Sequence, residues 1–169
     1  MAAKTGTYTL IASTTLGSDS ANIDFTSISG SYTDLVLVVV GNSTNANAGS
    51  LYVRVNNDSA TNYSNTQIYG DGTTAASVRN SNTNNANGLG INSTSQSPSV
   101  GIAHFQDYSN TTTYKTILMR NTMPQAEASA SVALWRSTSA INRITLSHSS
   151  SNLKAGTTAK LYGIEAGNL

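Results

Sequence analysis

Short apolar segments with strand-like alternation recur along the chain, and clusters of Gly, Asn, Asp and Ser separate them. In Leu51–Val55 the aliphatic side chains fall on one face and the polar ones on the other, as in a half-buried strand. Ala21–Phe25 repeats this pattern, with Ile23 and Phe25 directed inward. Leu35–Val40 is instead a continuous aliphatic run, which predicts a central strand covered on both faces.

The whole pattern predicts about ten short strands and almost no helix. Without crossover helices the strands should be antiparallel, and two packed sheets are expected rather than one exposed sheet. The predicted fold class is therefore an all-β, antiparallel two-sheet β-sandwich, jelly-roll-like. The expected strands are Thr7–Thr15, Ala21–Ser27, Asp34–Asn42, Ser50–Asn56, Leu89–Thr94, Ser99–Tyr108, Tyr114–Thr122, Ala130–Ser137, Ile141–Ser147 and Ala159–Glu165, with a short extra piece at Thr66–Tyr69.

The segment Asp58–Gly88 has the densest turn-forming sequence, including Gly70–Gly72 and Ser81–Asn87. About thirty residues with so little periodicity predict a functional or contact-making loop, unless strands are hidden in it. No fixed-period repeat or linker interrupts the chain. We therefore expect one β-sandwich domain over residues 8–169, preceded by an N-terminal arm of residues 1–7.

The composition limits the classes of function. Ser, Thr and Asn make up 67 of the 169 residues, whereas charged residues make up 10% and cysteine is absent. The nine Lys and Arg are scattered from Lys4 to Lys160, so no basic stripe for nucleic acid is present. Leu35–Val40 is too short to span a membrane, and Met1–Leu10 lacks the apolar stretch of a secretory signal. We expect a neutral-surfaced domain made in a cytoplasm, with no nucleic-acid or membrane partner.

Groups that could carry out catalysis are few. The chain has 25 serines, but only His104 and His148 could serve one of them as a base. His104 shares its strand parity with Val100 and Ile102, which predicts a packed or interface histidine. The histidines lack metal-ligand spacing, the carboxylates form no close pair, and Asp71-Gly72 indicates a turn rather than a calcium loop. We predict no enzyme, no catalytic residue, no metal and no cofactor.

Aromatic side chains are the candidates for binding sugars, because exposed rings stack on them. Tyr63, Tyr69 and Tyr108 border Asn-rich turns and are the predicted glycan contacts. Trp135 lies in a predicted strand with apolar residues on both faces. That position favours packing in the core or in a subunit interface over a sugar platform.

Several short motifs follow one another along nearly the whole chain. They are Tyr8–Ile11, Ile23–Ile28, Tyr32–Val38, Leu51–Asp58, Asn62–Ser64, Trp135–Ser137, Ala140–Leu146 and Leu161–Ile164. Their order resembles a family of small structural proteins of tailed bacteriophages, frequent in phages of cyanobacteria and other aquatic bacteria. The resemblance implies a non-enzymatic virion component with a jelly-roll-like sandwich, either a head decoration (cement) protein or a fibre or tail-tip piece. It defines no catalytic residue.

The expected function is that of a capsid decoration protein, which binds the outer face of the major capsid protein shell and stabilises it. Such a protein needs contact area more than a pocket, and closed symmetry at a local threefold predicts a homotrimer. The expected location is the capsid surface of the virion. The expected contacts are Lys4, Thr5 and Thr7 of the arm, together with Trp135 and Arg136. The alternative is a tail or head fibre module that binds a host surface glycan through the three tyrosines.

Overall fold

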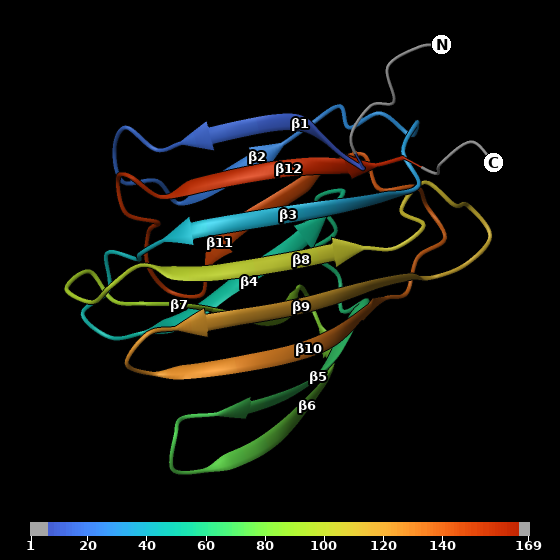
Figure 1. Ribbon diagram of the computed structural model, residues 1–169. Coiled ribbons are helices and arrows are strands. Elements are labelled where there is room, and N and C mark those ends of the chain that lie inside the picture. Colours follow the sequence, from blue (N-terminus) through green and yellow to red (C-terminus); the bar gives the residue numbers. More distant parts are fainter. Residues whose placement is uncertain (1–6, 166–169) are drawn as a thin grey trace.

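The computed structural model describes residues 7–165, and these form two packed antiparallel β-sheets without any helix (Figure 1). The larger sheet has eight strands in the order β1-β12-β3-β8-β9-β10-β5-β6, and the smaller has four in the order β2-β11-β4-β7. The predicted two-sheet, jelly-roll-like sandwich is confirmed. The strands are β1 (Tyr8–Thr15), β2 (Asn22–Phe25), β3 (Asp34–Gly41), β4 (Gly49–Val55), β5 (Tyr63–Gly70), β6 (Ala75–Thr83), β7 (Ala86–Ile91), β8 (Ser99–Phe105), β9 (Lys115–Met123), β10 (Glu127–Trp135), β11 (Ile144–His148) and β12 (Thr158–Ile164).

The core lies between the two sheets and is built from the inward positions that alternation predicts. Leu51, Val53 and Val55 of β4 are fully buried, and Ile23 and Phe25 of β2 are nearly so. From the larger sheet, inward residues of β3, β8, β9 and β12 complete the same cluster. Period-two burial of this kind is what a strand with one covered face requires.

Of the two alternatives for Asp58–Gly88, the hidden strands are confirmed and the long loop is wrong; the predicted extra piece Thr66–Tyr69 lies within β5. This segment holds β5, β6 and the first residues of β7. Strand β6 is an edge strand that pairs only with β5, and most of its side chains are exposed, so the chain there shows no apolar alternation. The turn between β5 and β6 is the predicted one, because the Asp71 carboxylate accepts hydrogen bonds from the backbone N–H groups of Thr73 (2.9 Å) and Thr74 (2.7 Å).

The continuous aliphatic run of β3 faces the core with only one of its two sides. As predicted, β3 is central in its sheet, between β12 and β8. Leu35, Leu37 and Val39 point into the core, but Val40 on the other face is 40% exposed. Covering on both faces was predicted and is wrong, because the second sheet packs on one side of the larger sheet only (Figure 1).

Candidate functional site

One broad face of the larger sheet lacks a covering layer in the described chain, and we call this side the outer face. It is the side turned away from the smaller sheet (Figure 1). Large exposed apolar patches on soluble proteins usually mark contact surfaces. Seven of the nine exposed large hydrophobic side chains among residues 7–165 point to it, namely Tyr8, Leu10, Val40, Ile68, Val100, Leu118 and Val132.

Cross-strand pairing arranges the outer face in rows, because directly paired residues share one face of a sheet. One row runs from β3 to β5 and consists of Val38, Ile102, Arg120, Ala130 and Ile68. The next row consists of Val36, His104, Leu118, Val132 and Thr66. Most members of both rows are aliphatic, so each polar member has apolar neighbours on the adjoining strands.

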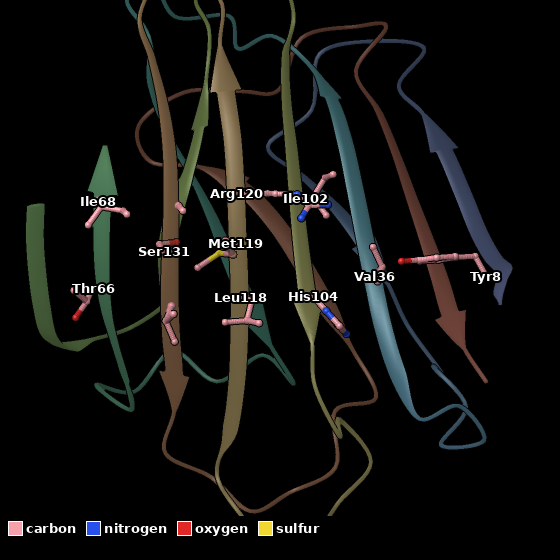
Figure 2. A pocket seen from close by; sticks show the side chains of 12 residues that line it. Tyr8, Val36, Thr66, Ile68, Ile102, His104, Leu118, Met119, Arg120 and Ser131 are labelled. Atoms are coloured by element: carbon pink, nitrogen blue, oxygen red, sulfur yellow. The ribbon is translucent and has the colours of Figure 1, made fainter. Parts of the chain in front are cut away.

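A hollow of about 570 Å³ lies over these two rows. Figure 2 shows its lining side chains, with Arg120 beside Ile102 near the middle and Tyr8 reaching across β12 toward Val36. Among residues 7–165, no hydrogen bond or ion pair joins the Arg120 guanidinium to another side chain. The hollow therefore presents an unpaired cation within an apolar surface.

Positive charge predominates on the outer face. Arg79 and Lys160 also project from it, from β6 and β12, and they too lack a partner in the described chain. The acidic group of the same face is Asp34, and it is already engaged. Its Oδ2 lies 2.9 Å from His104 Nε2, and its Oδ1 accepts a hydrogen bond from the Asp107 backbone N–H at 2.8 Å.

The His104–Asp34 pair lies among aliphatic neighbours of the outer face. The cross-strand neighbours of His104 are Val36 and Leu118, and no described hydroxyl group hydrogen-bonds to the ring. A nucleophile would have to lie within hydrogen-bond reach of this base. His104 is instead a half-buried residue of the outer face, on the same side as Val100 and Ile102, as its parity predicts.

Two of the three tyrosines predicted to stack on a glycan are core residues. Tyr63 and Tyr108 are both fully buried, so the prediction is wrong for them. The Tyr63 hydroxyl accepts from the Val55 N–H (3.2 Å) and donates to the Asp58 carbonyl (3.2 Å), and burial raises its pKa to about 12. The Tyr108 hydroxyl donates to the Ser29 carbonyl. Both rings border polar turns and are nevertheless buried, because each hydroxyl hydrogen-bonds to a backbone carbonyl of a neighbouring loop inside the protein.

Trp135 also belongs to the core, so it is not available as the predicted capsid contact. It is 2% exposed, its ring stacks on Tyr63, and its Nε1 donates to an oxygen of the Asp58 carboxylate at 2.7 Å. Arg136 is half-buried and donates to the Thr61 carbonyl (2.6 Å) and to Asn82 (3.0 Å). Of the predicted contacts in the arm, Thr7 is exposed just before β1, whereas Lys4 and Thr5 lie outside the described residues.

Tyr69 is the predicted glycan contact that remains accessible. It is half-buried in a second hollow, of about 360 Å³, between the ends of the two sheets. This inter-sheet cleft is lined by β5, β7, the first residues of β4 and the turn that leads into β10. Strand alternation could not have indicated it, because its lining comes from segments that are distant in the sequence.

His148 is far from His104 and lies on the smaller sheet. It is 7% exposed, and its Nδ1 accepts a hydrogen bond from the Ser150 N–H at 3.1 Å. Its Nε2 is buried without a partner and faces Gly49. Burial lowers the pKa of His148 below its ordinary value of 6.5. No group of three or more potential metal ligands occurs among residues 7–165.

The buried His148 predicts a pH-dependent stability. A lowered folded-state pKa means that the unfolded chain binds the proton more readily, so protonation favours unfolding. Stability should be constant above the unfolded-state value of 6.5 and fall as the pH drops below it, levelling off under the folded-state pKa. Urea unfolding at about pH 7.5 and about pH 5 measures this fall. His148→Gln should flatten that part of the profile. A slope equal to that of the wild type would contradict the assignment.

Comparisons with known proteins do not identify a family. No family model matches the chain, and no curated protein matches it. Among solved structures, an exo-inulinase from Aspergillus awamori matches 93% of the chain at 13% identity and a TM-score of 0.46, and the chain spans 29% of that enzyme's chain. The Caenorhabditis elegans galectin LEC-6 matches 91% of the chain at 9% identity and a TM-score of 0.36, and the match covers 96% of the galectin.

A galectin from toad ovary, solved with thio-digalactose, matches 83% of the chain at 15% identity and a TM-score of 0.38, and the match covers 98% of that protein. With identities of 9–15% and TM-scores below 0.5, these likenesses carry no conclusion about the chain. Within residues 7–165, no helix is long and apolar enough to cross a membrane.

Proposed function

We propose that the protein is a non-enzymatic structural component of a tailed-phage virion, a decoration protein that binds the capsid shell through its outer face. The observation that carries this proposal is the uncovered apolar outer face itself. In a two-layer sandwich each sheet needs one apolar face, which packs against the other sheet. Here the larger sheet has apolar residues on both faces, and its second set is exposed. A surface of this kind is best explained by a partner that covers it.

The size of the outer face suits a stable protein interface. Eight strands about 4.8 Å apart, each about eight residues long at about 3.4 Å per residue, present on the order of 1,000 Å². A standard protein–protein interface takes about 800 Å² from each partner. The central aliphatic side chains would supply the buried core of such an interface, and the polar strand ends would form its rim.

The charges on the outer face favour a partner that differs from this chain. If two outer faces met, the cations Arg79, Arg120 and Lys160 of one copy would face those of the other, and like charges in an interface oppose association. A partner surface with apolar side chains and carboxylates would complement them. We assign that surface to the major capsid protein. The homotrimer remains a prediction, and its contacts would then use surfaces other than the outer face.

A single substitution on the outer face tests the proposal. Val132→Asp places a carboxylate on a side chain that is 48% exposed, between Leu118 and Thr66. We expect capsids of the encoding phage, assembled without this protein, to bind the wild type in a sedimentation assay. Burying an unpaired charge should weaken binding of the variant by at least about a hundredfold. Circular dichroism should show that the free Val132→Asp variant remains folded.

Val78→Asp is the matched control. Val78 is 40% exposed, but it pairs with Gln67 and points to the opposite side of the larger sheet. The Val78→Asp variant should bind capsids as the wild type does. Equal loss of binding in both variants would refute the role of the outer face, and a wild type that does not bind capsids would refute the decoration function itself.

A further inference from the structure

The inter-sheet cleft around Tyr69 is separate from the outer face, and the two hollows share no lining residue. Its walls come from strands β4, β5, β7, β9 and β10 and from the turn between β9 and β10. The side chains that matter for binding are Ser50, Gln67, Tyr69, Asn87 and Glu127. Gly49 and Gly90 also line the cleft. At about 360 Å³ the cleft is at the small end of the range for ligand sites.

Polar groups in this cleft have no partner within the described chain. The side chains of Gln67, Asn87 and Glu127 and the hydroxyl of Tyr69 make no hydrogen bond to any of residues 7–165. Glu127 is half-buried, and burial together with the nearby Asp71 raises the pKa of its carboxyl. Donors and acceptors that converge on a hollow without satisfying one another are available to a ligand.

The lining excludes several classes of ligand. An anion would face the Glu127 carboxylate, and no Lys, Arg or His side chain lines the cleft to offset the repulsion. A metal ion would find a single carboxylate and no described cluster of ligands. An apolar molecule would strip water from four polar groups and give them nothing in return.

A neutral sugar ring satisfies all of these groups. Its C–H face can lie against the Tyr69 ring, while its hydroxyl groups donate to and accept from amide and carboxylate side chains. We propose that the inter-sheet cleft binds a neutral saccharide of one or two rings, with Tyr69 as the stacking platform and Gln67, Asn87 and Glu127 as hydrogen-bonding partners. This site would give the protein a binding activity in addition to its structural role, and it does not depend on that role.

The test uses the isolated protein and a panel of neutral methyl glycosides and disaccharides, with simple primary amines included. Saturation-transfer NMR identifies which members bind, and titration gives their affinities. We expect at least one neutral saccharide to bind and Tyr69→Ala to weaken it by about tenfold or more, as loss of a stacking contact requires. Glu127→Gln keeps the shape of the side chain and should weaken the same ligand to a smaller extent.

Tyr114→Ala is the matched control, because Tyr114 is 55% exposed in the loop before β9 and lies outside the cleft. It should bind the saccharide with unchanged affinity. The proposal is overturned if no saccharide in the panel binds, if Tyr69→Ala binds as well as Tyr114→Ala, or if only the amines bind. Circular dichroism of each variant establishes that it is folded. None of these results depends on whether capsids bind the outer face.

Discussion

Replacing Gly163 with alanine is expected to lower the free energy of unfolding by about 3 kcal/mol, at the upper end of the usual cost of overpacking. Gly163 lies in β12 and points inward, where the ring of Tyr32 covers its α-carbon. A β-carbon at this position would lie 2.3 Å from the Tyr32 Cγ and Cδ1 atoms. The Tyr32 ring would have to leave its place against the core, because a close-packed interior has no void that could accept the added carbon.

Urea unfolding followed by circular dichroism measures this loss. Gly17→Ala is the matched control, since nothing lies within 4 Å of its added β-carbon, and its stability should be close to that of the wild type. The variant Tyr32→Ala removes the ring, and Gly163→Ala should then cost much less in that background. A cost that is the same with and without the ring would show that the contact is not its cause.

Removal of the Asp58 carboxylate should have the second-largest effect, a loss of about 2 kcal/mol in stability. Asp58 accepts hydrogen bonds from Trp135 Nε1 (2.7 Å), Asn62 Nδ2 (2.8 Å) and the Ala60 backbone N–H (2.9 Å). Burial alone would raise the pKa of Asp58, but the hydrogen bonds from Asn62, Trp135 and Ala60 outweigh it and lower the pKa. Asp58→Ala leaves the buried indole N–H without an acceptor, and an unsatisfied buried donor is costly.

Asp58→Asn separates the hydrogen bond from the charge. Its amide oxygen can still accept from the indole, so we expect it to lose clearly less stability than Asp58→Ala. Because Trp135 is the single tryptophan of the chain, its fluorescence reports on this region during unfolding. If the two variants unfold at the same urea concentration, Asp58 stabilises the protein through its charge and not through the hydrogen bond from the Trp135 indole.

Internal hydrogen bonds also explain why Tyr63 and Tyr108 are not glycan contacts and Trp135 is not a capsid contact, whereas core packing of Trp135 was predicted correctly. Tyr63, Tyr108 and Trp135 each carry one polar atom that the fold satisfies from within, through backbone groups or Asp58. A ring with a satisfied polar atom can be buried completely even next to polar turns. Sequence neighbours give no indication of this, because several of the partners belong to segments far away in the chain.

The sequence by itself determined the strands with an apolar inward face and the absence of helix. Alternation in β2 and β4, and the aliphatic run of β3, specify strands whatever the partners are, since side chains alternate across any strand. The sequence could not determine β6. Most side chains of β6 are exposed on both faces, so they show no apolar alternation, and β6 is a strand because it pairs with β5.

The tertiary structure alone decided which apolar face stays uncovered. The sequence marks both faces of β3 as apolar. The packing of the smaller sheet on one side leaves Val36, Val38 and Val40 outward, beside His104, Ile102 and Val100 of β8. The inter-sheet cleft arises in the same way, because Gln67, Asn87 and Glu127 meet through chain folding over distances that no local pattern encodes. Local periodicity fixes the direction of each side chain within its own strand, whereas which strands become neighbours is set by the packing of the whole core.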